Sequence, residues 1–387
     1  MLTNRSLLIN FLRWFSAMLV LISHIRSVLF EDYQQLNSQS YFLKFFYFIT
    51  SLGHEAVIVF FVISGYLVGG GIVRKIQASS FQLTDYALKR FSRLYVVLPV
   101  ALLLTFVFDA FGAYISASKI YEQNTYISSL GYNIVQRLSF EHFASSFFML
   151  QNIVKPPFGS NGPLWSLSYE FWYYVIAGIT GAFLSRINDK RFFSAVLLSF
   201  LMIALISFLP LVILKYFSIW MLGVMIVVLN YRVQSLRLFY TFCVCLVLYV
   251  LILKYGVLPN FFTQFYKDFT LGGLIALTLA SIVDKKEQQY GIHYLLSSFS
   301  YTLYLIHFPF MLFILALLFE YIGFGIKEIP SVRTFSCFFI LTILLMFTSF
   351  FLAQYTELKT HLIRKKILRY LRQIRMFSGN LTTLKHK

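Results

Sequence analysis

The chain carries ten long apolar runs, and these runs constrain its fold more than any other feature. Most have roughly the 17 to 25 residues that a helix needs to cross the hydrocarbon core of a bilayer. The runs at 216–231 and 268–283 are short, and a further apolar stretch at 140–150 is too short to span, which leaves a re-entrant segment as one interpretation. Lipid offers the backbone no hydrogen-bond partner, so such runs must be helices that satisfy their own N–H and C=O groups. We therefore predict an all-α, polytopic transmembrane bundle with spans at about 7–29, 46–73, 94–115, 163–184, 192–214, 216–231, 238–255, 268–283, 298–320 and 333–355.

Composition agrees with a membrane protein. The 387 residues are 59% hydrophobic and 12% charged, and this charged fraction is about half that of a typical soluble domain. A net charge of +18 suggests nucleic acid at first, but the cations stand in short clusters between apolar runs, as they do in membrane-flanking loops. We expect no nucleic-acid partner. Cys243 and Cys245 lie two apart in one run and Cys337 stands alone, so we expect neither a disulfide framework nor a metal site.

The basic residues predict the topology. Most of the 33 Lys and Arg residues fall in alternate loops and in the tail, which the positive-inside rule assigns to the cytoplasm. Both termini are then cytoplasmic and the number of spans is even. The first run is longer than a signal-peptide core and lacks a small-residue cleavage site, so we interpret it as a retained helix. We expect a membrane unit at 1–355 and a basic tail at 356–387 along the anionic inner leaflet.

The first run places two ionisable residues at membrane depth. It reads NFLRWFSAMLVLISHIRSVLF and contains Arg13 and His24. Their separation of eleven positions is about three helical turns, so both side chains share one face about 16.5 Å apart. Such residues are costly in lipid and indicate a functional site by default. Histidine, with an unperturbed pKa of about 6.5, suits general-base catalysis. For His24 alone, a structural hydrogen bond to a neighbouring helix is an equal alternative.

Three more ionisable residues fall at a depth similar to that of His24. His54 and Glu55 come near the outer end of the second run, and Glu170 lies about 10 Å inside the fourth. We predict that Glu170 or Glu55 accepts a hydrogen bond from the second imidazole nitrogen of His24 and so fixes its tautomer. Lateral packing, which the sequence does not supply, decides whether these groups meet. Otherwise each is a structural partner for some other helix.

Two further segments suggest ligand contact. Arg90 and Arg93 precede the third run, three residues apart, and lie on one helix face. Such a pair suits a phosphate-bearing ligand, while a positive-inside anchor is the simpler reading without other evidence. Ser64 lies in FFVISGYL, where it and Gly65 permit a close approach of two helices. A nucleophilic role for Ser64 would require an adjacent base.

The remaining candidates are in aromatic-rich segments. Trp165, in NGPLWSLSYEFWYY, follows Pro163 at the start of a helix and fits an interfacial aromatic belt. Tyr304 and His307, in YTLYLIHFP, are one turn apart, and Pro309 is expected to kink that helix. His307 falls near mid-membrane. Its structural alternative is a hydrogen bond to the backbone that Pro309 disturbs.

Five of these stretches together resemble one family. Arg13 with ten residues before His24, then GHEAVIVFFVISGYL, KRFSRLYVVLP, NGPLWSLSYE and SYTLYLIHFP, follow the order found in the acyltransferase 3 family of integral membrane proteins. The resemblance extends from Arg13 to about Glu357. It implies a bundle of about ten helices in the bacterial inner membrane. It also implies transfer of an acyl group, usually acetyl, from cytoplasmic acyl-coenzyme A, a donor substrate and no permanently bound cofactor, to a carbohydrate hydroxyl.

The resemblance also implies roles for individual residues. The essential residues of the first helix, the basic pair before the third and the tryptophan and glutamate of the fourth correspond to Arg13, His24, Arg90, Arg93, Trp165 and Glu170. Two positions depart from the pattern. Tyr169 and Phe171 flank Glu170 where relatives often have a small apolar residue and a second acid, which argues against a two-carboxylate mechanism there. Lys359 stands where proline is common.

These observations predict an integral-membrane O-acyltransferase. Coenzyme A would dock by its phosphates at Arg90, Arg93 and Arg13, and His24 would deprotonate a hydroxyl of a surface polysaccharide or its lipid-linked precursor. The long loop at 116–162 is expected to help select this acceptor. Two alternatives remain. One is a transporter or flippase for a lipid-linked sugar, which would also need ionisable groups in the membrane; the other is an acyltransferase for a small-molecule metabolite.

Overall fold

The computed structural model describes residues 2–36, 40–116, 120–122, 130–229, 234–256, 263–283, 286–287 and 291–370. The described chain is helical apart from a two-residue antiparallel pairing of β1 (Leu2–Thr3) with β2 (Lys286–Glu287), which confirms the all-helical fold. Parts of the predicted acceptor loop, at 117–119 and 123–129, lie outside the described residues, as does the predicted tail beyond 370.

The helices follow one another with few long connections. The first half contains α1 (Asn4–Leu29), η1 (Tyr33–Gln35), α2 (Tyr41–Thr50), α3 (Gly53–Ser64), η2 (Gly65–Gly69), α4 (Gly70–Gln77), α5 (Leu83–Tyr95), α6 (Leu98–Ser116), η5 (Val135–Leu138) and α7 (Phe140–Phe147). The second half contains η6 (Gly162–Leu164), α8 (Trp165–Asn188), α9 (Phe192–Phe208), α10 (Leu211–Leu229), α11 (Leu236–Lys254), α12 (Gln264–Ser281), α13 (Ile292–Ser297), α14 (Ser300–Ile322), α15 (Val332–Tyr355) and η7 (Glu357–Lys359).

The number of helices fit to cross a membrane is smaller than the number of apolar runs. Within the described residues, six helical stretches are long and apolar enough, or seven if the bent pair α9 and α10 counts as one span. The prediction of ten spans, and of the side on which each terminus lies, stays a prediction. Acidic and polar side chains lower the hydropathy of α8 and α12, and both helices pack inside the bundle.

The predicted boundary between the fifth and sixth spans is wrong. We expected 192–214 and 216–231, but α9 ends at Phe208 and α10 begins at Leu211. Pro210 lies in this break, and proline in a helix interior removes a hydrogen bond and clashes with the preceding turn. The two helices meet there at an angle of 117°.

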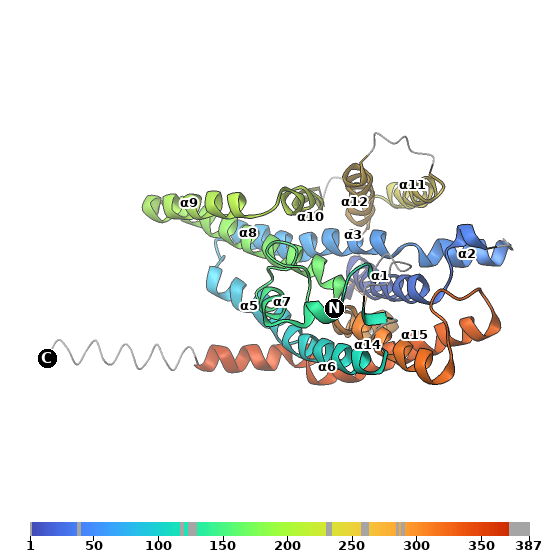
Figure 1. The fold of residues 1–387 in the computed structure, drawn as a ribbon. Coiled ribbons are helices and arrows are strands. Elements are labelled where there is room, and N and C mark those ends of the chain that lie inside the picture. Colours follow the sequence, from blue (N-terminus) through green and yellow to red (C-terminus); the bar gives the residue numbers. More distant parts are fainter. Residues whose placement is uncertain are drawn as a thin grey trace.

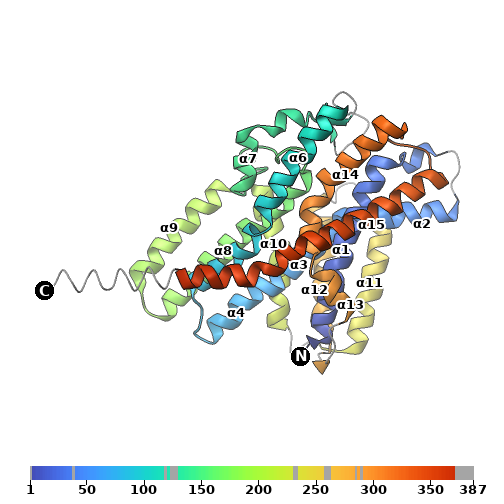
Figure 2. The ribbon, with the colours of Figure 1, turned by 90° about the horizontal axis from the view of Figure 1, so that it is seen from below.

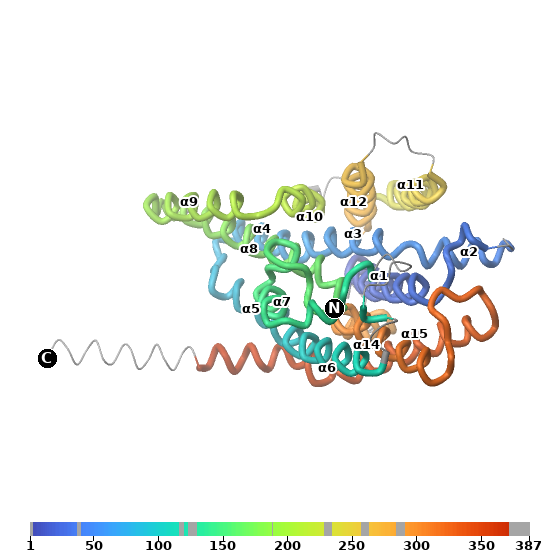
Figure 3. Tube along the Cα trace, in the orientation of Figure 1, coloured from blue at the N-terminus to red at the C-terminus, as the bar shows by residue number. Residues whose placement is uncertain are grey.

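One helical run crosses the molecule and organises the rest. The run of α2, α3, η2 and α4 extends from Tyr41 to Gln77 (Figure 3). Helix α1 packs along α3, and α14 packs along α6 and against α1 and α15. Figure 2 shows α2 and α4, the two ends of this run, on opposite sides of the bundle, and Figure 1 shows α5 on the side away from α2. This places the two ends of the run in different regions of the molecule.

A close contact between two glycines joins this run to α10. A Cβ atom on Gly65 would lie 1.9 Å from the Trp220 carbonyl oxygen, and one on Gly223 would lie 2.0 Å from that of Val62. No side chain fits at either position without a backbone shift. The predicted close approach at Ser64 and Gly65 is therefore confirmed, and the approaching helix is α10.

The outer surface of several helices is strongly apolar. Helix α11 has no buried residue, and Phe193 of α9 is 91% exposed. Large exposed apolar surfaces are rare on soluble monomers. Such a surface is typical of a bundle that lipid surrounds.

Candidate active site

A cavity of about 340 Å³ lies where α1, α3, α5, α8 and α14 converge, and we call it the α5 cavity. Its polar wall consists of Arg13, Ser64, Arg90, Arg93, Ser166, Glu170, Tyr174, Ser300, Tyr301 and Tyr304. Its apolar wall consists of Val57, Phe60, Phe61, Ile63, Leu67, Leu167 and Val68. Three arginines that are far apart in the sequence thus meet in one place, together with Glu170, Ser64 and Tyr304 from the predicted set.

The α5 cavity carries an excess of positive charge. Besides the three arginines, its wall has one carboxylate, that of Glu170. The Arg90 guanidinium lies 5.6 Å from the centre of the Tyr174 ring, and its buried Nε has no hydrogen-bond partner among the described residues. Arginine groups in this state are suited to a phosphate-bearing ligand, because the guanidinium binds phosphate oxygens in pairs.

A second carboxylate, that of Glu357, lies next to Arg13 outside the cavity lining. The sequence did not lead us to predict it as a site residue. An Arg13 Nη2 lies 4.0 Å from Glu357 Oε1. The other oxygen of Glu357 accepts hydrogen bonds of 3.0 Å from both the backbone N–H and the hydroxyl of Thr302. Glu357 therefore caps the first turn of α14 while it neutralises part of the Arg13 charge. The sequence signal for Glu357 was a carboxylate placed directly after the last apolar run.

A chain of hydrogen bonds runs along the wall from Trp220 to Glu170. The Trp220 indole N–H donates to Ser64 Oγ over 3.1 Å, and the Tyr174 hydroxyl donates to Glu170 Oε1. Because the single Tyr174 proton goes to Glu170, the 3.2 Å contact between Ser64 Oγ and the Tyr174 oxygen has Ser64 as its donor. Ser64 thus has polar partners on both sides, and no histidine is among them.

His24 pairs with another histidine. His24 Nδ1 lies 2.8 Å from His307 Nε2, and the two rings are nearly parallel with centroids 5.1 Å apart. His307 Nδ1 faces the carbonyl oxygens of Leu303 and Tyr304, at 3.0 and 2.8 Å. A carbonyl only accepts, so His307 carries its proton on Nδ1 and accepts at Nε2. His24 then donates from Nδ1, which leaves a lone pair on His24 Nε2.

A side chain from another segment replaces a helical hydrogen bond that is missing near His307. Pro309 has no N–H to donate to the Leu305 carbonyl, four residues before it. The Asn161 side-chain amide donates to that carbonyl over 2.9 Å and to Thr105 Oγ1 over 3.0 Å. The segment that contains NGPLW therefore completes the helix that contains YLIHFP. His307 bonds to the carbonyls of the preceding turn and leaves the carbonyl freed by Pro309 to Asn161.

The α5 cavity and the histidine pair are adjacent but separate. Phe60 and Tyr304 line the cavity, and their rings lie 6.0 Å apart. The Tyr304 ring is in turn 5.9 Å from the His307 ring. His24 is absent from the described lining, so a ligand in the cavity meets Tyr304 before it meets a histidine. Tyr304 is fixed by its hydroxyl, 2.6 Å from Ser166 Oγ and 3.0 Å from the Pro163 carbonyl.

The structure does not bear out the predicted orienting carboxylate. Glu170 binds Tyr174, Glu55 forms a 2.7 Å ion pair with Lys254, and neither contacts the imidazole of His24. His307 occupies the position that we assigned to an acid. The prediction relied on matching depth, whereas the lateral packing of α1 against α14 decides the partner.

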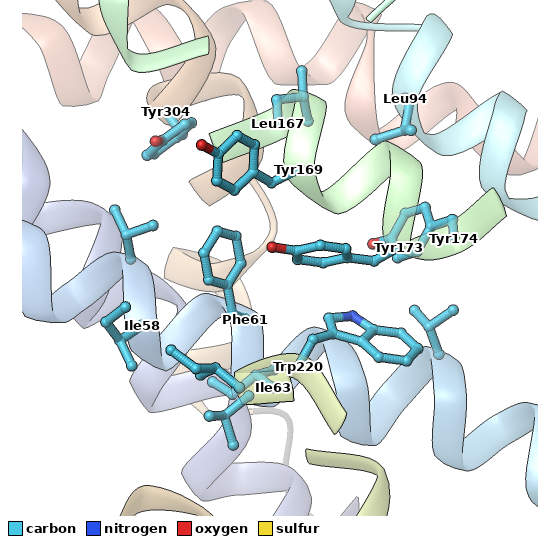
Figure 4. Packing of buried hydrophobic residues seen from close by; sticks show 14 of the residues in the cluster. Ile58, Phe61, Ile63, Leu94, Leu167, Tyr169, Tyr173, Tyr174, Trp220 and Tyr304 are labelled. Carbon is cyan, nitrogen blue, oxygen red and sulfur yellow. The ribbon is translucent and has the colours of Figure 1, made fainter. Parts of the chain in front are cut away.

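Two other candidates form separate clusters. His54 Nε2 lies 2.9 Å from Asp268 Oδ2, and this carboxylate also accepts from Tyr216 and Gln264. Asp268 was missed, although an acid inside an apolar run was a visible signal. The Trp165 ring packs edge-on against Tyr169 and Phe61. Figure 4 shows the rings of Phe61, Tyr169 and Tyr173 gathered beside Trp220 in this aromatic core.

Comparison with known proteins decides the family. The family model for the acyltransferase domain, Acyl_transf_3, matches residues 7–352. The chain belongs to this acyltransferase 3 family. A protein of Shigella phage Sf6 named O-acetyl transferase is 32% identical to this acyltransferase 3 protein over 204 residues. The match covers 50% of the chain and 51% of the phage protein, so the chain spans about half the length of this relative. No solved structure matches the chain. Family membership and the apolar helices together identify an integral membrane protein.

Proposed function

We propose that this protein moves an acyl group, normally acetyl, from cytoplasmic acyl-coenzyme A to a hydroxyl of a surface polysaccharide or its lipid-linked precursor. The family supports acyl transfer, and the name of the phage relative, O-acetyl transferase, supports acetyl transfer to oxygen. The observation that carries the proposal is the histidine pair, because it leaves His24 Nε2 with a free lone pair beside a cationic cavity.

In this proposal, the negative charge of the phosphates holds acyl-coenzyme A in the α5 cavity. The phosphates of acyl-coenzyme A bind at Arg90, Arg93 and Arg13, and the thioester arm extends through the α5 cavity along Ser64 toward Tyr304. Glu170 acts from the wall, where it holds Tyr174 beside Arg90. The rings of Phe60 and Tyr304 must turn aside before the thioester carbonyl reaches His24.

The reaction then needs a single base. His24 Nε2 takes the proton of the acceptor hydroxyl as the hydroxyl oxygen attacks the thioester carbonyl carbon. A carbon–oxygen bond forms, the carbon–sulfur bond breaks, and the sulfur leaves as coenzyme A thiolate. Imidazolium of His24 returns its proton to that thiolate, so the products are an ester and free coenzyme A. His307 keeps the His24 ring oriented throughout, as the aspartate does in a catalytic triad.

Mass spectrometry of surface glycans tests this reaction. Cells with the wild-type gene, without it, and with His24→Ala are compared, and we expect the glycan to lose an acyl-sized mass in the latter two. General-base removal reduces turnover by about 10²- to 10⁴-fold. His361→Ala, at an exposed histidine outside the site, is the matched control and should acylate normally.

The same comparison separates the competing functions. A transporter would leave the glycan chemistry unchanged while unmodified precursor accumulates inside the cell. Loss of acyl mass from a small metabolite alone would indicate the small-molecule acyltransferase. Near wild-type acylation by a normally inserted His24→Ala protein would refute the proposed mechanism.

A further inference from the structure

A second cavity, of about 930 Å³, lies at the α2 end of the bundle, away from α5 (Figures 1 and 2). We call it the α2 cavity. Residues of α1, η1, α2 and α11 and their flanks line it, namely Arg26, Tyr33, Tyr41, Lys44, Phe45, Tyr47, Phe48, Ser51, Leu251, Lys254 and Tyr255. The wall therefore combines three cations with six aromatic rings.

No carboxylate is among the described residues of this wall. Two of the acids nearby already have cationic partners. Glu55 pairs with Lys254 over 2.7 Å, and Asp32 pairs with Lys327 over 2.8 Å. Among the described residues, neither Arg26 nor Lys44 forms an ion pair with a carboxylate, although the charge of Asp32 acts on Arg26 from outside the wall. The wall itself therefore carries positive charge, which favours an anionic ligand.

Two polar atoms of the wall are buried and unsatisfied. Arg26 Nε and the Tyr33 hydroxyl have no hydrogen-bond partner among the described residues. The Arg26 guanidinium is nevertheless held in place, 5.4 Å from the centre of the Tyr47 ring. Buried polar groups are normally paired in folded proteins. The α2 cavity thus presents fixed donors that lack an acceptor, as a ligand site does before its ligand arrives.

An ordinary membrane-interface belt would also bring cations and aromatic rings together. In such a belt, however, long basic side chains extend their charged ends into water. The Arg26 side chain instead lies against Tyr47 with its Nε buried. This burial distinguishes the α2 cavity from a simple anchor.

We infer that the α2 cavity binds the phosphate or diphosphate group of an amphipathic acceptor, in which that group joins the sugar to a lipid. The inference rests on the proposed function, since it names the form in which the acceptor is presented. Arg26 and Lys44, which form no ion pair among the described residues, are suited to phosphate oxygens, and exposed rings such as Phe45, 65% exposed, suit the adjoining lipid chain.

The position of Arg26 relative to His24 sets the distance between the phosphate group and the hydroxyl that is acylated. Arg26 follows His24 by two residues in α1, so the two side chains project from nearly opposite faces, about one helix diameter of 10 Å apart. A hydroxyl at His24 is therefore well removed from the phosphate. The acylated sugar then extends around α1 from the α2 cavity.

Ligand binding by the full chain in uncharged phosphatidylcholine nanodiscs tests the inference. The probe is farnesyl diphosphate, with farnesol and inorganic pyrophosphate as its two halves. We expect farnesyl diphosphate to bind more tightly than either half. Loss of one charge-assisted contact should weaken it roughly tenfold in Arg26→Gln and in Lys44→Gln. Lys215→Gln, at an exposed lysine of α10 outside the wall, is the matched control and should bind normally.

Several outcomes would overturn the inference. Pyrophosphate binding as tightly as the farnesyl compound would indicate a site for free phosphate, and farnesol binding as tightly would indicate an apolar groove. Equal affinity in the wild type and the Arg26→Gln and Lys44→Gln variants, or no binding at all, would also refute it. If Arg26→Gln does not fold, Tyr33→Phe removes one buried hydroxyl only and should weaken binding about threefold.

Failure of this inference is distinguishable from failure of the proposed function. Acyl-coenzyme A binding and glycan acylation are measured on the same variants. If acylation depends on His24 but diphosphate binding is unchanged in Arg26→Gln, the acyltransferase proposal stands and this inference fails. Diphosphate binding that depends on Arg26, without any acylation, would overturn the acyltransferase proposal and leave the lipid-phosphate site standing.

Discussion

The two cavities of this molecule differ in how their positive charge is balanced. In the α5 cavity three arginines stand near Glu170, Glu357 and a chain of hydroxyl groups. In the α2 cavity Arg26 and Lys44 have no acid in the wall. In the α5 cavity the two carboxylates offset part of the charge, although the buried Nε of Arg90 still lacks an acceptor among the described residues. In the α2 cavity no acid of the described wall offsets the charge, and both Arg26 Nε and the Tyr33 hydroxyl lack a partner. An anionic ligand would therefore complete more of the contacts of the α2 cavity than of the α5 cavity.

The largest expected effect comes from the helix that joins the two cavities. Gly65→Ala places a Cβ atom 1.9 Å from a backbone oxygen, which the structure can relieve only by moving α10. We expect the variant to lose about 3 kcal/mol of unfolding free energy, near the upper end for overpacking, and both cavities to lose ligand binding together. Thermal unfolding in detergent, followed by tryptophan fluorescence, measures this.

Gly71→Ala is the matched control, because nothing lies within 4 Å of a Cβ atom there. It should unfold at or slightly above the wild-type temperature, since alanine favours a helix more than glycine does. Equal unfolding temperatures for Gly65→Ala and Gly71→Ala would contradict the close contact.

The next effect separates binding from chemistry. His307→Ala removes the acceptor for His24 Nδ1, so the catalytic ring loses its orientation and tautomer. We expect kcat to fall about 100-fold, or about 2.7 kcal/mol, with unchanged affinity for acyl-coenzyme A and for farnesyl diphosphate. His307→Gln, whose amide oxygen still accepts a hydrogen bond, should recover part of this loss. Transfer of labelled acetyl to surface glycan reports kcat, and a higher KM with unchanged kcat would instead place His307 in ligand binding.

A smaller effect sharpens the difference between the two ends. Arg93→Gln should weaken acyl-coenzyme A binding about tenfold, the cost of one charge-assisted contact, and leave farnesyl diphosphate binding unchanged. Arg26→Gln should do the reverse. Titration of each ligand against both variants provides the comparison. If either substitution weakened both ligands equally, the two cavities would be parts of one site.

The smallest effect concerns the segment of α14 between the cavities. Asn161→Ala leaves the Leu305 carbonyl without a donor, at a cost of about 1 kcal/mol, the lower end for an unsatisfied buried polar group. In a Pro309→Ala background the helix supplies its own N–H to that carbonyl, so the same substitution should cost clearly less. A double-mutant cycle of unfolding free energies measures the coupling. Additive losses would show that Asn161 and Pro309 act independently.

The sequence predicted the all-helical fold because hydropathy is a local property, whereas the count of ten spans stays a prediction. It also placed Arg13 and His24 on one face of one helix, which helical periodicity dictates. The partner of His24 was not predictable in this way, because His307 is 283 positions away and only packing brings α14 against α1. The contact of Glu170 with Tyr174, in contrast, follows from a spacing of four residues and was available from periodicity.

Span boundaries show the same limit. Pro210 is a visible break signal, but the apolar run continues through it, so hydropathy alone does not locate the break. Asp268 and Glu357 were visible as acids in or beside apolar runs. Their partners, His54 and Arg13, come from helices that are distant in the sequence. Residue type therefore indicated which side chains form polar contacts, while the packing of the helices determined the partner of each.

The contact of Gly65 with Gly223 restricts how this protein can move. Backbone atoms of η2 and α10 meet with no side chain between them, so sliding of these helices past each other would bring side chains into contact with backbone and is disfavoured. A carrier that exposes its site alternately to two sides needs such sliding or rocking between its halves. In the proposed reaction, the route from the α5 cavity to His24 would open through side-chain rotation of Phe60 and Tyr304, or through hinging of α14 at Pro309. Spin labels on α3 and α10 should therefore keep one fixed separation through the whole catalytic cycle.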